Sequence, residues 1–164
     1  MSRLGRGFPI QPWIQDFYVP TATITGDATA SITEADIVAG GKQIIITLRG
    51  TTWVAAFPFF DAQRQPIIDG ISAASSPALG WNDEVRDKEV VTAVVRTSDT
   101  VVTVTLTASA LYNISSQEVI TVTVPASATN IIGAITGSPT FTVDAVATSI
   151  PIFAHHYRQL QGVN

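Results

Sequence analysis

Short segments of alternating, mostly β-branched residues recur along this chain and constrain its fold more than any other feature. Alternation with a period of two is typical of a strand that has one face in a core and one face in water. Many such strands, separated by turn signals such as Ser98-Asp99, predict a mainly β fold, an antiparallel β-sandwich. The predicted strands are 43–50 (QIIITLRG), 90–97 (VVTAVVRT), 100–108 (TVVTVTLTA), 118–126 (EVITVTVPA) and 140–146 (TFTVDAV).

The segment before the first long strand predicts two short strands and a capped helical turn. Residues 21–33 alternate threonine or serine with small apolar residues, and Gly26-Asp27 breaks the pattern. Thr33 and Asp36 have the spacing of a capping box, so Thr33 is the predicted N-cap of a helix. Gly40-Gly41 then ends that helix after a turn or two.

Two further segments form a predicted helical insert. The first is 61–74 (DAQRQPIIDGISAA), where Pro66 fits best if the helix begins near it. The second is 79–88 (LGWNDEVRDK), in which Glu84 and Lys88 are spaced for an i,i+4 ion pair. Three isoleucines of the first segment are predicted to share one helix face: Ile67, Ile68 and Ile71.

The two ends of the chain differ in composition from the segment between them. Residues 8–20, FPIQPWIQDFYVP, contain four aromatic rings and three prolines, although the whole chain is 8% aromatic. Proline favours extended backbone in itself and in the residue before it. We therefore divide the chain into an extended N-terminal arm (1–20), a sandwich (21–146) and an apolar C-terminal tail (147–164).

These end segments, together with the FPFF run at 57–60, are the predicted partner-binding regions. Ordering an isolated arm costs about 1–2 kcal/mol per residue, and buried rings offset that cost only against a surface. For the arm, the alternative is packing along its own domain; for the FPFF run, it is packing in the core. The candidate binding residues are Phe8, Pro9, Ile10, Trp13, Ile14, Phe17, Tyr18, Phe57, Phe59, Phe60, Phe153 and Tyr157.

Composition narrows the classes of partner. The chain is 46% hydrophobic and 13% charged, whereas about 25% charge is usual, so its surface is suited to protein contacts. Its net charge of −4 opposes nucleic-acid binding, which needs a basic face. No apolar run reaches the length of a membrane span, so a membrane partner is not expected. The absence of cysteine excludes disulfides, thiolate metal sites and a cysteine nucleophile.

No motif predicts catalysis or a cofactor. The chain has neither a G-x-S-x-G elbow nor a phosphate-binding G-x-x-x-x-G-K-[ST] loop. His155 and His156 have no acidic neighbour in sequence, so we expect surface or interface histidines rather than metal ligands. The acids within 83–89 alternate with Arg86 and Lys88, which is typical of a solvated helix face. We therefore expect neither an enzyme nor a metal site.

A group of motifs resembles a bacterial and phage Ig-like module. The motifs are Gly40-Gly41-Lys42 before the IIITL strand, Gly80-Trp81-Asn82, Arg96 to Thr100, and Tyr112 to Pro125. Together they span about three quarters of the chain. The resemblance implies an Ig-like sandwich that serves as a structural or decorating module without chemistry. The aromatic stretch 52–60 departs from the pattern, which is expected to be more polar there.

The arm and the resemblance together predict a phage virion structural protein, most simply a capsid decoration or cement protein. Its partners would be the major capsid protein or other virion subunits, and further copies of itself. It would reside in the virion after assembly in the host cytoplasm. Two alternatives remain open: a tail, neck or fibre protein with the same fold, and an adhesion module whose aromatic residues at 53–60 bind glycan. For Trp81 we expect a core position instead.

Overall fold

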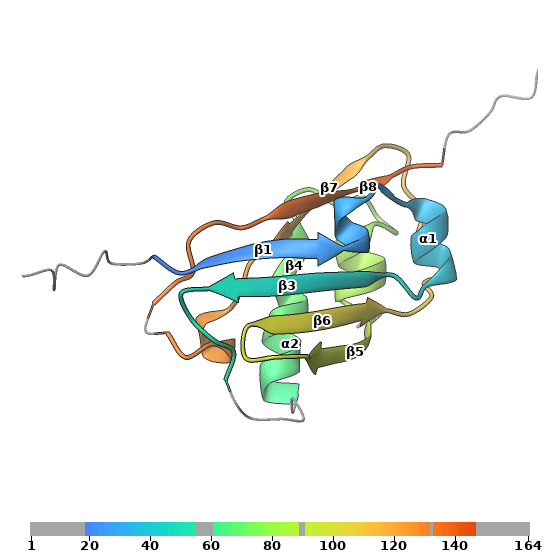
Figure 1. The fold of residues 1–164 in the computed structure, drawn as a ribbon. Helices are drawn as coiled ribbons and strands as arrows, with labels where there is room; N and C mark the ends of the chain where they lie inside the picture. Colours follow the sequence, from blue (N-terminus) through green and yellow to red (C-terminus); the bar gives the residue numbers. More distant parts are fainter. Residues whose placement is uncertain (1–18, 55–60, 89–90, 132, 147–164) are drawn as a thin grey trace, which may run out of the picture.

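A computed structural model describes residues 19–54, 61–88, 91–131 and 133–146. These residues form a β-sandwich of two four-stranded sheets with a few short helices, as Figure 1 shows. The predicted mainly β fold is therefore confirmed.

The first sheet has the strand order β1-β3-β6-β5, and every neighbouring pair in it is antiparallel. Figure 1 shows these four strands side by side. Each corresponds to a segment predicted from β-branched alternation. Their bounds are Thr21–Gly26 for β1, Gln43–Arg49 for β3, Val101–Leu106 for β6 and Val91–Arg96 for β5.

The second sheet has the order β2-β8-β7-β4, and here β2 runs parallel to β8 while the other pairs are antiparallel. Two of its strands, β7 and β8, were predicted as strands, and β4 was not. The bounds are Ile32–Thr33 for β2, Thr140–Asp144 for β8, Glu118–Val122 for β7 and Ile71–Ala73 for β4.

The strand order identifies the kind of sandwich. When the seven strands other than β2 are lettered A to G along the chain, the first sheet reads A-B-E-D and the second reads G-F-C. This is the arrangement of an immunoglobulin-type sandwich. The predicted Ig-like topology is confirmed, with β2 as an added short strand beside β8. The inter-sheet disulfide of antibody domains has no counterpart, because the chain has no cysteine.

The core lies between the sheets and follows directly from alternation. Every second residue of β3 and β6 is buried, while the residues between them face outward. Burying one such aliphatic side chain contributes about 1.5–3 kcal/mol relative to leaving it in water. The inward residues of these two central strands are Ile44, Ile46, Leu48, Val102, Val104 and Leu106.

The first helix, α1 (Glu34–Ala39), has the predicted capping box. The Thr33 amide donates to the Asp36 carboxylate over 2.9 Å, and the Asp36 amide donates to the Thr33 hydroxyl over 3.3 Å. The Thr33 hydroxyl also donates to the Asp36 carboxylate, over 2.8 Å. The hydrogen bonds from the Thr33 amide and hydroxyl, followed by that from Lys42, hold the pKa of Asp36 below its usual range. The helix ends at Gly40, whose φ of 74° is in the left-handed region that favours glycine.

The second helix, α2 (Asp61–Asp69), is shorter than the predicted 61–74, and Ile71 belongs to β4 rather than to the helix. Residues 71–73 leave the helical pattern because they pair with residues 120–122 of β7. Ile67 and Ile68 are buried, as expected from a shared apolar face. Pro66 lies inside the helix rather than near its start.

The predicted helix at 79–88 is a single π-helical turn, η2 (Trp81–Arg86). In this turn the Asp87 amide donates to the carbonyl of Asn82, five residues earlier, over 2.9 Å. Two 3₁₀ turns complete the described elements: η1 (Asp27–Thr29) follows β1, and η3 (Ala126–Ala128) follows β7.

Candidate functional site

All twelve candidate partner-binding residues fall in segments 1–18, 55–60 and 147–164, which lie outside the described residues. His155 and His156 lie there as well. The assignment of these residues to a partner surface therefore stays a prediction. What the structure describes is the body to which the segments connect.

The N-terminal arm and the C-terminal tail join this body at opposite ends. The Pro20 carbonyl accepts a hydrogen bond from the Thr136 amide over 3.0 Å, which places the start of β1 beside residue 136. At the other end, the Val146 amide donates to the Glu34 carboxylate over 3.3 Å, next to the start of α1. Figure 1 shows the start of β1 and the last described residues after β8 at opposite ends of the sandwich.

Apart from Arg49, which is exposed at the end of β3, the outward side of the first sheet has no ionisable side chain among its described strand residues. Register places Thr25, Ile45, Thr103 and Val95 in one row across all four strands. We call this surface the neutral face. Its residues are Thr23, Thr25, Ile45, Thr47, Ala93, Val95, Val101, Thr103 and Thr105.

Five of the nine residues of the neutral face are threonines, in line with the polar outward residues expected of an antiparallel sheet that meets water on one side, and none of the nine is charged. Here valine, isoleucine and threonine methyl groups make a β-branched surface, and Val95 is 47% exposed. On the outward side of the second sheet, the Asp144 carboxylate lies at the end of β8, as Arg49 does at the end of β3. Hydrogen bonds, first from Ser31 and then from Gln117, hold the pKa of Asp144 below its usual range.

Sequence reasoning did not single out Glu118, the first residue of β7, whose side chain is 3% exposed. Its carboxylate accepts hydrogen bonds from the Tyr112 hydroxyl over 2.7 Å, the Ser76 hydroxyl over 2.5 Å and the Trp81 amide over 2.9 Å. Gly80 belongs to this arrangement, because a Cβ there would lie 2.8 Å from a Glu118 oxygen. Burial, and next the hydrogen bond to Glu118, raise the pKa of Tyr112 well above its usual value.

The function of this buried carboxylate is structural. N–H and O–H donors from three segments of the chain surround its two oxygens and satisfy them inside the fold. It ties the loop after β4, the π-helical turn and the segment before β7 into one unit. The sequence signal for this buried carboxylate is a glutamate at the start of an apolar strand, six positions after Tyr112.

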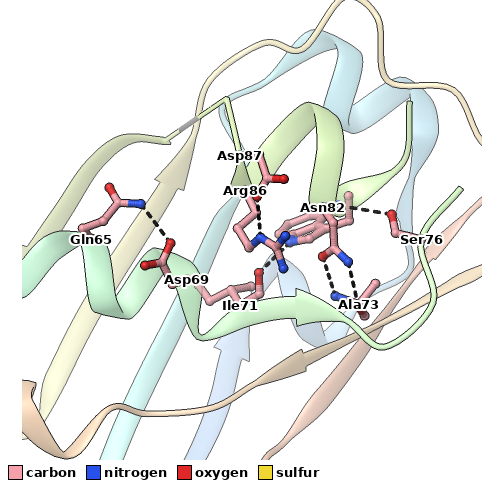
Figure 2. Close-up of polar contacts among 9 residues, drawn as sticks. Gln65, Asp69, Ile71, Ala73, Ser76, Asn82, Arg86 and Asp87 are labelled. Atoms are coloured by element: carbon pink, nitrogen blue, oxygen red, sulfur yellow. Dashed lines mark hydrogen bonds and ion pairs between the residues drawn. The ribbon is translucent and has the colours of Figure 1, made fainter. Parts of the chain in front are cut away.

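The same π-helical turn covers the outer edge of β4, as Figure 2 shows. The Asn82 side chain accepts from the Ala73 amide over 3.0 Å and donates to the Ala73 carbonyl over 2.8 Å. The Trp81 indole N–H donates to the Ile71 carbonyl over 2.8 Å. Because these groups occupy the positions that another strand would use, this edge is closed to strand addition.

The acidic cluster at 83–89 is not a uniformly solvated face. Glu84 is 3% exposed, and its carboxylate pairs with Lys88 at 2.5 Å, so the expected i,i+4 pair forms from a buried acid. The Asp87 pKa is lowered by its hydrogen bond from Arg86. Among the described residues, no group of three or more histidines and acids is placed to hold a metal ion.

The tryptophans weaken the glycan alternative. Trp53 is fully buried, so it cannot present a ring to a sugar as part of a 53–60 platform. Trp53 forms an isolated β-bridge with Thr129. It lies in the core because the backbone of residues 52–54 hydrogen-bonds to residues 128–130 and to Asp99. Trp81 is buried as expected and meets the Phe141 ring edge-on, with centroids 5.5 Å apart.

Two shallow polar pockets adjoin the Glu118 unit. One, of about 470 Å³, has four serines among its nine lining residues and includes Ser76 and Glu118. The other, of about 400 Å³, includes Glu34 and Val146, and Ser115 lines both. The described residues present no charged group in either pocket that lacks a protein partner, so neither pocket defines a ligand class.

Comparison of this chain with family models, with curated proteins and with solved structures finds no match. None of the described helices is both long enough and apolar enough to span a membrane. The fold and its surfaces are therefore the observations on which a function can be argued.

Proposed function

We propose that this chain is a structural protein of a bacteriophage particle, a capsid decoration or cement protein. Its N-terminal arm and C-terminal tail would bind the major capsid protein or other virion subunits, and it would be located in the virion after assembly in the host cytoplasm. In this proposal the protein binds without catalysis and needs no cofactor.

The observation that carries the proposal is the attachment of the two apolar segments at opposite ends of a compact sandwich. A cement protein must contact at least two neighbours at once, and such a layout suits that task. The neutral face gives further support, because a low-charge surface of this kind favours protein contact. The resemblance of the Gly80-Trp81-Asn82 and Tyr112 to Pro125 motifs to phage Ig-like modules points the same way.

The test is incorporation into particles by the full-length chain. Quantitative mass spectrometry of purified particles should find this protein in a simple ratio to the major shell protein. A handful of copies would favour a tail, neck or fibre position, and absence from particles would overturn the proposal.

The arm is tested by replacing its rings within the intact chain. Trp13→Ser with Phe17→Ser should lower incorporation at least tenfold without changing the thermal unfolding of the sandwich. Changing residues 13 and 17 is preferable to deleting 1–20, because the Pro20 carbonyl takes part in the fold. Normal incorporation of this variant would contradict the role of the arm.

A further inference from the structure

We infer that the neutral face of one copy is the docking surface for the N-terminal arm of a second copy. This inference rests on the proposed function and names the partner of the arm. The occupant is the segment 8–18, FPIQPWIQDFY, of the neighbouring molecule.

The side chains of segment 8–18 are chemically compatible with those of the neutral face. The segment 8–18 has one ionisable acid, Asp16, among its rings and aliphatic residues, apart from the weakly acidic Tyr18. The neutral face offers β-branched methyl groups with threonine hydroxyls between them, and so it imposes no charge that a ring would have to desolvate. Aromatic rings bury about 150–250 Å² each, and a shallow sheet surface of this kind gives them apolar contact.

The other outer surfaces fit the arm less well. The outer side of the second sheet is bounded at β4 by the π-helical turn. The β4 edge itself is closed by Asn82 and Trp81. The neutral face combines the exposed Val95 and the half-buried Ile45 and Val101 with uncharged strand centres, and Arg49 lies at the end of β3.

The point where the arm joins the body permits exchange between copies. The arm enters at Thr21, on β1, which is an edge strand of the same sheet that bears the neutral face. An extended segment spans up to about 3.3–3.6 Å per residue, so 18 residues reach about 60 Å. Four strands spaced about 4.8 Å apart are far narrower than that reach. The arm is long enough to leave its own sheet and cross that of a neighbour.

Such an exchange is a head-to-tail contact, because each copy gives an arm and receives one. Contacts of this kind close into rings when the rotation between copies allows it. A ring of sandwiches with interlocked arms would be a natural decorating unit, and its C-terminal tails would remain at the ends opposite the arm attachments.

The test uses introduced cysteines, since the chain has none. Full-length Gln15→Cys is mixed with full-length Val95→Cys under mild oxidation, and disulfide-linked heterodimer is measured on non-reducing gels. Gln15 lies within the arm but outside the predicted contact residues. The matched control is Val119→Cys, on the second sheet, because Val119 and Val95 are similarly exposed at 51% and 47%.

The expected result is at least tenfold more heterodimer with Val95→Cys than with Val119→Cys. Equal yields would overturn the inference, as would a predominance of Val95 homodimers, which would mean that two neutral faces meet. A Gln15→Cys/Val95→Cys double variant that cross-links within one chain would also overturn it, because the arm would then cover its own sheet.

The result of the cross-linking experiment can be distinguished from the result of the incorporation experiment that tests the proposed function. Incorporation into particles without the Gln15–Val95 cross-link would leave the virion assignment standing and overturn the docking surface. The cross-link without any incorporation would support the docking surface and overturn the virion assignment.

Discussion

The end of the sandwich around Glu118 and the neutral face distribute charge in opposite ways. Around Glu118 a carboxylate is buried and surrounded by donors from three segments of the chain. On the neutral face, side chains that meet water have no ionisable group. A soluble domain usually shows the reverse, with acids outside and apolar groups inside.

The difference shows what each region does. A buried acid is tolerated only when donors satisfy it, so the Glu118 unit specifies the position of the loops that it joins. An uncharged outer face contributes little to the fold, because its side chains gain little from folding. Its composition is the basis of the docking surface that we propose. Three changes test this division between a structural interior charge and a surface kept for a partner.

Glu118→Leu should have the largest effect on the isolated protein. The change keeps much of the side-chain volume but leaves the Tyr112, Ser76 and Trp81 donors without their acceptor. Since each unsatisfied buried donor costs about 1–3 kcal/mol, we expect a loss of about 3 kcal/mol or more in the free energy of unfolding. Urea denaturation measures it.

Glu118→Gln is the matched comparison for this substitution, because it retains an acceptor oxygen and should lose less stability. Asp83→Asn, at an exposed position of the same turn, should leave the midpoint unchanged. A loss below about 1 kcal/mol for Glu118→Leu would mean that the buried carboxylate does not hold the unit together.

High pH should have an intermediate effect through Tyr112. Its folded pKa is raised by burial and by Glu118, while an unfolded tyrosine has a pKa of about 10. The stability it contributes is therefore fully present below pH of about 10 and declines as pH rises further, by up to about 1.4 kcal/mol per unit. Urea midpoints measured from pH 8 to 11 should show this decline.

Tyr112→Phe removes the titrating group and provides the control. This variant should be less stable than the native chain at pH 8, and its midpoint should fall less steeply above pH of about 10. Parallel slopes for the two proteins would show that Tyr112 is not the source of the alkaline loss.

Thr103→Lys, at the centre of the neutral face, should have the smallest effect on the folded monomer. Its side chain points outward, so unfolding should change by no more than about 0.5 kcal/mol. Association between copies should nevertheless weaken, which sedimentation at increasing protein concentration would detect. Thr121→Lys, on the middle of β7 in the second sheet, is the matched control and should associate normally.

A large loss of stability for Thr103→Lys would break the comparison, because the neutral face would then be part of the fold. Equal weakening of association by Thr121→Lys would show that added charge acts through the whole surface rather than at one face.

Sequence patterns predicted the parts of this fold that depend on local chemistry. Alternation in 43–49 and 101–106 decides which residues of β3 and β6 face the core, since successive side chains point to opposite faces. The capping box of Thr33 and Asp36 and the stop at Gly40 are equally local. Helix 61–74 was predicted too long because no local signal shows that Ile71 pairs with Val122, 51 positions away.

What tertiary structure alone decided is which side chains distant in sequence meet. Periodicity predicted an antiparallel sandwich, and the resemblance of several motifs implied that the sandwich is Ig-like. Only the folded chain brings Glu118 to Ser76 and Trp81, buries Trp53 and Glu84, closes the β4 edge with Asn82, and sets the two terminal segments at opposite ends. These are long-range contacts, whose energies depend on burial and geometry that no short stretch of residues contains.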